Sequence, residues 1–279
     1  MKTLSVATLA SWWAGAGATI TSDSQAGGSL LEDIVARGHL RVGTTGSYAP
    51  FSHLVSNATE NGTSFIGADI DMAMSLASAL GFTSSSPSVV FVPTTFADLA
   101  TGAAAGLFDI GMSGVSITLA RALQGVFFST PVLRVGKVAC VRCERAAQGE
   151  FATLASIDRP GVKVATPAGG SNEAFDRAHF PAADIVVYAD NTDIFRALLN
   201  ETADVVVTDR VEAELWARLH RGVLCAVRPE SPYSFEELGY VLPRDVAWLQ
   251  FVNTWLHIEQ GSGEWNSTLQ RWMDYAWET

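Results

Sequence analysis

Short apolar segments that end in small or polar residues alternate with helical patterns along the chain. In the second half we expect strands in "GVKVATPAGG" (161–170), "ADIVVYAD" (183–190) and "ADVVVTD" (203–209). Helical patterns follow each of them, over residues 171–180, 192–200 and 210–220. The first half repeats this order, with strands expected over residues 39–45, 89–94 and 108–114. Alternation of strand and helix predicts parallel βαβ units.

The two sets of units are joined near residues 131–140, which indicates two α/β lobes. A chain of 279 residues, 48% hydrophobic, has enough apolar material for two cores. Ligands of open parallel sheets lie beyond the carboxyl ends of the strands, so we expect the site in a cleft between the lobes. The net charge of -11 argues against a nucleic-acid partner.

The N-terminal segment has the pattern of a secretory signal. Lys2 precedes a short apolar run, and small residues follow towards Ala26, so we predict a signal peptide over residues 1–26. No other stretch is long and apolar enough to span a membrane. Four asparagines stand in N-x-S/T sequons, and we predict them as glycosylation sites: Asn57, Asn61, Asn200 and Asn266. These features predict a secreted or periplasmic protein.

Three cysteines are present, and in an oxidising compartment we expect one disulfide. Cys140 and Cys143 form a C-x-x-C, but a second pair for zinc is lacking. We favour a bond between Cys143 and Cys225 with Cys140 left over, while the other pairings remain open at this point.

Several segments resemble the extracellular solute-binding proteins of the polar amino-acid type. They are "LRVGTTGSYAPFS", "GADIDMAMSLASALG", "FDIGMSGVSITLARA" and "FSTPVL", and the likeness in order and spacing covers roughly residues 38–275. The resemblance implies a two-lobed periplasmic-binding-protein type II fold with a ligand cleft between the lobes. On this basis we expect lobe 1 to comprise residues 27–134 and 229–279, and lobe 2 residues 135–228.

A narrower resemblance is to the cyclohexadienyl dehydratases, a family of exported enzymes with this fold. It rests on "DIDMA", "MSGVSI", "PAGGSNE", "LHRGVLCAV", "YVLPRD" and "WLHIEQGSG". It implies conversion of prephenate to phenylpyruvate and of arogenate to phenylalanine without a cofactor, with Glu173 as general acid. It also places Cys143 and Cys225 at that family's cysteine positions. Phe96 and Thr118 depart from the family pattern, which has Trp and Asn there.

Arg121 and the turn before residue 171 are the candidate anion-binding groups. Arg121 follows a strand end in "SITLAR", where a guanidinium can hold a carboxylate with two parallel hydrogen bonds. The Gly169-Gly170-Ser171 turn offers backbone N–H groups at a helix N-terminus. The expected substrate-binding residues are Tyr48, Phe96, Ser113, Ser116, Thr118, Arg121, Gly170, Ser171, Asn172, Arg177 and Asp209.

Glu173 lies in a first helical turn, where an acidic residue commonly just complements the helix dipole. To act as an acid it must carry a proton near neutral pH. We expect desolvation and substrate carboxylates to raise its pKa in the closed, liganded state. Asn172 and Arg177 could hold the Glu173 carboxyl in place. A guanidinium beside it would lower that pKa, however, so we expect Arg177 to contact substrate or structure instead. Asp209 is expected to meet an α-amino group, to cap the next helix, or both.

Metal and nucleotide chemistry are not indicated. The histidines lack the spacing of metal ligands, and no P-loop or dinucleotide fingerprint is present. The expected partner is a small carboxylate substrate, and the sequence leaves a homo-oligomer open. The alternative function is that of a non-catalytic amino-acid-binding protein serving a transport system.

Overall fold

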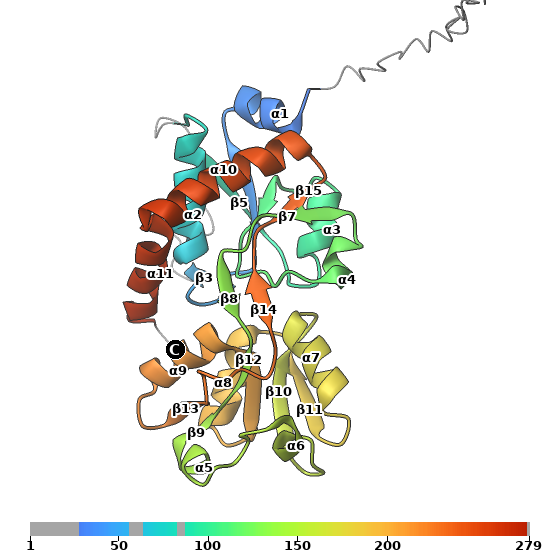
Figure 1. Cartoon of the computed structure of the whole chain (residues 1–279), viewed down its shortest axis with the longest axis vertical. Coiled ribbons are helices and arrows are strands. Elements are labelled where there is room, and N and C mark those ends of the chain that lie inside the picture. Colours follow the sequence, from blue (N-terminus) through green and yellow to red (C-terminus); the bar gives the residue numbers. More distant parts are fainter. Residues whose placement is uncertain (1–27, 56–63, 83–86, 278–279) are drawn as a thin grey trace, which may run out of the picture.

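The computed structural model describes residues 28–55, 64–82 and 87–277 and contains two five-stranded sheets, each the centre of one lobe (Figure 1). In lobe 1 the strand order is β5-β1-β6-β15-β7. Strand β1 pairs in parallel with both β5 and β6, whereas β15 runs antiparallel to β6 and β7. The bounds are β1 Leu40–Thr44, β5 Val89–Pro93, β6 Ile110–Gly111, β7 Val126–Phe128 and β15 Val241–Pro243.

Lobe 2 is built on the second sheet, with the order β11-β10-β12-β9-β13. Strands β10, β11 and β12 are parallel, and β9 joins antiparallel to β12 and β13. Central strands β9 and β12 are buried throughout most of their length, as their unbroken apolar runs predict. The bounds are β9 Lys137–Arg142, β10 Lys163–Pro167, β11 Asp184–Tyr188, β12 Val205–Asp209 and β13 Leu224–Val227.

The chain passes between the lobes twice, in β8 (Leu133–Val135) and β14 (Glu236–Leu238), which pair antiparallel at the waist of the molecule (Figure 1). A three-stranded sheet of β2 (Ser47–Tyr48), β3 (Ser52–Val55) and β4 (Ser64–Ile66) adds to lobe 1. The exact lobe boundaries expected from the sequence stay a prediction.

Helices cover both sheets. Those of lobe 1 are α1 Leu30–Arg37, α2 Ala68–Ala79, α3 Leu99–Ala104, α4 Leu119–Ala122, α10 Val246–Ser262 and α11 Glu264–Asp274. Those of lobe 2 are α5 Cys143–Ala147, α6 Leu154–Ile157, α7 Ser171–His179, α8 Asn191–Leu199 and α9 Arg210–Leu219. Helices α10 and α11 are separated at Gly263, which has a φ of 86°. Within the described ranges no helix has the length and apolarity to cross a membrane.

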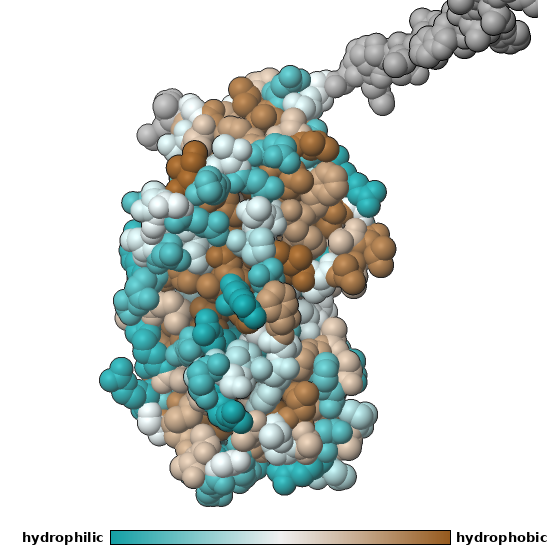
Figure 2. All heavy atoms as spheres, in the orientation of Figure 1, coloured by the Kyte–Doolittle hydropathy of each residue, from teal (hydrophilic) through white to brown (hydrophobic). Residues whose placement is uncertain are grey.

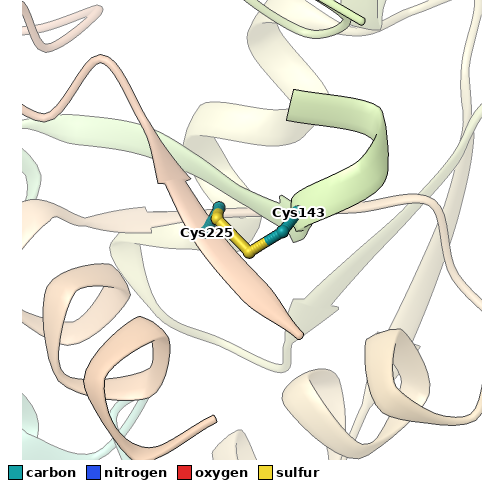
Figure 3. Close-up of a disulfide and its surroundings, with 2 residues drawn as sticks. All are labelled: Cys143 and Cys225. Carbon is teal, nitrogen blue, oxygen red and sulfur yellow. A yellow bond between two sulfur atoms is a disulfide. The ribbon is translucent and has the colours of Figure 1, made fainter. Parts of the chain in front are cut away.

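A disulfide joins Cys143, at the start of α5, to Cys225 in β13 (Figure 3). The expected pairing is thus confirmed, and Cys140 remains a buried free thiol. Pairing of β9 with β13 brings the two cysteines together, with 4.9 Å between their Cα atoms. The bond closes a loop of 82 positions in sequence, which includes nearly all of lobe 2.

The signal peptide and two of the predicted glycosylation sites, Asn57 and Asn61, lie outside the described residues. Asn200 and Asn266 are exposed, and their modification stays a prediction.

Candidate active site

A small pocket, with a cavity volume of about 20 Å³, lies between the two lobes. Residues from the ends of strands and the starts of helices surround it: Tyr48, Phe96, Gly114, Ser116, Arg121, Pro167, Gly170, Ser171, Asn172, Asn191 and Asp209. Most residues expected to bind substrate are therefore brought together. The structure adds Gly114, Pro167 and Asn191, which were not among the expected substrate-binding residues.

Arg121 is the positively charged residue among those that line this pocket. Thr118 caps α4 by accepting a hydrogen bond from the Arg121 backbone N–H. This cap fixes the start of α4, and with it the direction in which the guanidinium points, towards the pocket. The residue is 9% exposed, and its Nη1 donates to the Ser116 carbonyl at 2.8 Å. Burial lowers the pKa of Arg121, but a guanidinium stays charged in proteins. Among the described residues none forms a salt bridge with it.

The N-terminus of α7 forms the opposite wall. Gly169 has a φ of 73°, and a Cβ there would come within 2.9 Å of the Ala97 Cβ. Gly170 then enters α7 in an extended conformation, and no side chain caps the helix. The first N–H groups of α7 are thereby directed towards the pocket that Gly170 and Ser171 line. Binding of a carboxylate by this turn stays a prediction.

Aromatic rings form one side of the pocket. The ring of Tyr48 lies edge-on to that of Phe96, with 5.8 Å between centroids. Phe51 is fully buried and packs behind Tyr48, with 5.2 Å between the centroids of their rings. Phe51 therefore supports the wall without lining the pocket.

A buried lysine, not identified from the sequence, lies beneath the pocket. The Nζ of Lys137 donates to Asn172 Oδ1 at 2.5 Å, Asp209 Oδ1 at 2.8 Å and Ser171 Oγ at 3.2 Å. It also lies 3.1 Å from Glu236 Oε2. Burial alone would lower the pKa of Lys137, but the carboxylates of Asp209 and Glu236 outweigh it and raise that pKa. Lys137 is therefore a charged group.

Hydrogen bonds cross the pocket from lobe to lobe. The Tyr48 hydroxyl donates to Asp209 Oδ2 at 2.5 Å, and the hydroxyls of Ser116 and Ser171 are 2.9 Å apart. Burial raises the pKa of Tyr48 well above its ordinary value, and the Asp209 carboxylate adds to this, so the phenol is a neutral donor. These contacts hold the lobes together around the pocket.

A buried carboxyl lies behind this layer. Glu212 Oε1 accepts from Asn191 Nδ2 at 2.5 Å, and its Oε2 accepts from the Thr208 hydroxyl at 2.5 Å. Asn172 Nδ2 in turn donates to Thr208 Oγ1 at 2.9 Å. Burial raises the pKa of Glu212 to about 8, so it is largely protonated at neutral pH. Through these bonds Glu212 fixes two amides that line the pocket.

The proposed acid, Glu173, does not line the pocket in this conformation. Its Oε2 accepts from the Gly169 N–H at 2.7 Å, and its Oε1 accepts from Arg177 Nε at 2.8 Å. The hydrogen bond from the Gly169 N–H lowers the pKa of Glu173, and the neighbouring Arg177 guanidinium lowers it further. The expectation that Arg177 avoids this carboxylate is wrong, because residues four apart on a helix face each other.

Three other expected substrate ligands also lie outside the pocket. Ser113 is buried and bonds to the Thr45 hydroxyl at 2.7 Å, and Arg177 points to Glu173. Thr118 borders a neighbouring groove between α4 and α7. Asp209 makes no capping bond to α9, so that expected role is wrong; its oxygens are bound by Tyr48 and Lys137 instead.

Two leucines at α4 are exposed. Leu119 begins the helix and Leu123 follows its last residue, and they are 85% and 86% exposed. Figure 2 shows this side of the molecule indented between the lobes, with apolar side chains above the indentation, where Figure 1 places α4.

Comparison with known proteins identifies close relatives. The chain is 44% identical over 255 residues to the cyclohexadienyl dehydratase of Pseudomonas aeruginosa, covering 91% of this chain and 90% of that protein. The crystal structure of an ancestral amino acid-binding protein, described as a precursor of cyclohexadienyl dehydratase, matches with a TM-score of 0.76 at 32% identity. That match covers 88% of this chain and all of the other. An ancestral cyclohexadienyl dehydratase matches at 39% identity and a TM-score of 0.54, over 89% and 98% of the chains.

A family model provides the broader assignment. It matches residues 40–275, from the first strand of lobe 1 to the end of α11. Its members are extracellular, which agrees with the secreted or periplasmic location expected from the N-terminal segment. The chain belongs to the bacterial extracellular solute-binding proteins, family 3.

Proposed function

We propose that this protein is a cyclohexadienyl dehydratase, which converts prephenate to phenylpyruvate and arogenate to phenylalanine. The observation that carries the proposal is Arg121, a buried cation in the pocket for which no described residue provides a salt bridge. A buried charge of this kind requires a counterion, and both substrates carry carboxylates. The 44% identity to a dehydratase selects this activity among those of the family.

The residues that line the pocket offer a partner for each part of the substrate. One carboxylate binds Arg121, and the other binds the N–H groups at the start of α7. The ring lies against Tyr48 and Phe96. Fixing both carboxylates holds the ring in one orientation, which contributes to the rate by positioning alone.

The reaction requires one proton. An acid protonates the ring hydroxyl as its C–O bond breaks, and water leaves. The bond from the ring to its carboxylate breaks at the same time, carbon dioxide leaves, and that electron pair completes the aromatic ring. A well-placed general acid contributes about 10²- to 10⁴-fold.

Glu173 is the proposed acid. In the conformation described it is ionised and held by Gly169 and Arg177. We propose that substrate binding draws the carboxyl away from these partners and into the pocket, where desolvation raises its pKa. Two facts support this: Glu173 follows directly on Ser171 and Asn172, which line the pocket, and Arg177 is itself exposed.

The test compares Glu173→Gln with Arg177→Met, using prephenate and the absorbance of phenylpyruvate. Glu173→Gln should abolish turnover while keeping phenylpyruvate binding, because an amide cannot supply the proton. Arg177→Met should retain turnover and shift the pH profile upwards, because the carboxylate loses its cation. Full activity of Glu173→Gln would exclude this residue as the acid.

One observation favours a non-catalytic amino-acid-binding protein as the second candidate. Glu173 is ion-paired outside the pocket, and the pocket residues alone would suffice to bind a carboxylate ligand. This candidate predicts tight binding of an amino acid by the wild-type protein and no conversion of prephenate or arogenate.

A further inference from the structure

The two substrates of the proposed reaction differ at one carbon, which bears a keto group in prephenate and an ammonium in arogenate. An ammonium ligand needs a carboxylate that can bind it. Asp209 is the acidic residue among those that line the pocket. Its surroundings therefore decide how well the pocket distinguishes the two substrates.

Both oxygens of Asp209 are already bound by protein groups. Oδ1 accepts from Lys137 Nζ at 2.8 Å, and Oδ2 accepts from the Tyr48 hydroxyl at 2.5 Å. Asp209 itself is 3% exposed. Each oxygen keeps a second lone pair, but an α-ammonium that used it would have to share the oxygen with the Lys137 ammonium or with the Tyr48 hydroxyl.

Lys137 is held in place. The side chain is fully buried, and its ammonium contacts Asn172, Ser171 and Glu236 as well as Asp209. These contacts come from α7, β12 and β14, so withdrawal of the lysine would break bonds to three elements.

The charges around the pocket also disfavour an ammonium. Lys137 is a cation bound by the carboxylates of Asp209 and Glu236, and Arg121 is a second cation that forms no salt bridge with a described residue. Burial raises the pKa of two other buried acids, Glu212 to about 8 and Asp176 to about 7. An ammonium would therefore add a third positive charge near Lys137 and Arg121, whereas the keto substrate adds none.

We propose that Lys137 is a specificity-determining residue that occupies Asp209 and so makes the pocket prefer the α-keto acid substrate over the α-amino acid. This inference rests on the proposed function. Lys137 acts through Asp209 and does not line the pocket, so it is a positioning residue.

The experiment measures kcat/KM for prephenate and for arogenate in the wild type and in Lys137→Met. We expect the wild type to favour prephenate and the substitution to shift the ratio at least about tenfold towards arogenate, as Asp209 becomes free. Lys163→Met is the matched control, because Lys163 is an exposed lysine on β10, and it should leave the ratio unchanged. A loss of stability alone would lower both activities and leave their ratio constant.

Lys137→Met leaves two carboxylates without their cation. The double variant Lys137→Met/Glu236→Gln is therefore prepared alongside; it removes one of those charges and keeps Asp209 free. An unchanged ratio in either folded variant, checked by circular dichroism, would overturn the inference, as would a wild-type preference for arogenate.

Binding of the products separates this inference from the proposed function. Absence of turnover in the wild type refutes the dehydratase, but calorimetry with phenylpyruvate and phenylalanine still measures the same discrimination. Tighter binding of phenylpyruvate by the wild type, shifted towards phenylalanine in Lys137→Met, supports the role of Lys137. Equal affinities for the two products in the wild type contradict it.

Discussion

Replacing Arg121 with methionine should have opposite effects on stability and on ligand binding. The guanidinium is buried, and among the described residues it donates one hydrogen bond, to the carbonyl of Ser116. Methionine has a similar length without the charge. The ligand-free protein should therefore become more stable, whereas carboxylate binding should largely disappear.

The magnitudes follow from these contacts. Burial of an ion costs several kcal/mol, and one hydrogen bond from a charged group returns about 1.5–3 kcal/mol. The attraction of Asp209 and Glu236 offsets part of the remainder. We expect a net gain of about 1–2 kcal/mol in the variant, or roughly 2–6 °C in melting temperature. Loss of two charge-assisted bonds to a carboxylate should cost about 3–6 kcal/mol, which is about 10²- to 10⁴-fold in affinity.

Two assays measure the two effects. Differential scanning calorimetry without ligand gives the melting temperature, and titration calorimetry with phenylpyruvate gives the affinity. Arg159→Met is the matched control, because Arg159 also donates to a single backbone carbonyl, that of Ser156, but is exposed. It should change the melting temperature by less than about 1 °C and leave binding intact.

The reasoning fails if Arg121→Met binds phenylpyruvate within tenfold of the wild type. It also fails if the variant melts well below the wild type, because the guanidinium would then be a structural group that the ligand-free fold needs.

Two more predictions concern stability. The double variant Cys143→Ser/Cys225→Ser should have a free energy of unfolding about 4–5 kcal/mol lower, measured in urea, because the unfolded chain regains the entropy of an 82-position loop. The wild type treated with a reductant should match the variant. Equal stabilities of the variant and the oxidised wild type would contradict this prediction. The pKa of Glu212 is about 8 in the folded protein, against an ordinary value of 4.5. Its contribution to the free energy of unfolding is therefore full below about pH 4.5 and is lost as the pH rises to 8. The loss is up to about 1.4 kcal/mol per pH unit. Glu212→Gln should flatten this part of the profile of melting temperature against pH, and a parallel profile would show that Glu212 is not protonated.

The sequence predicted the elements whose signals are local. Strand β12 is an apolar run that ends at polar residues, and β10 leads into the Gly-Gly turn that α7 follows, so their positions agree with the expected ones. Strands β8 and β14 were not expected, because three residues carry no periodicity and each strand exists only through pairing with the other.

The pocket residues missed from the sequence lack such signals. Lys137 opens a strand, a position where a lysine is usually solvated, and only the packing of α7 and β14 over it makes it buried. Asn191 is the first residue of α8. Its hydrogen bonds to Ser47 and Glu212 join distant parts of the chain, so no local pattern indicates them. The pairing of Glu173 with Arg177 was predictable from helix geometry, and the functional argument led away from it.

The place of β15 affects the order in which the protein can assemble during synthesis. This strand lies between β6 and β7, so residues 241–243 fill a gap between two strands made more than a hundred positions earlier. The sheet of lobe 2 needs only residues 137–227 and can form while the ribosome is still working. The first sheet stays divided until almost the whole polypeptide has emerged, so a product truncated before β15 would expose that unfilled gap.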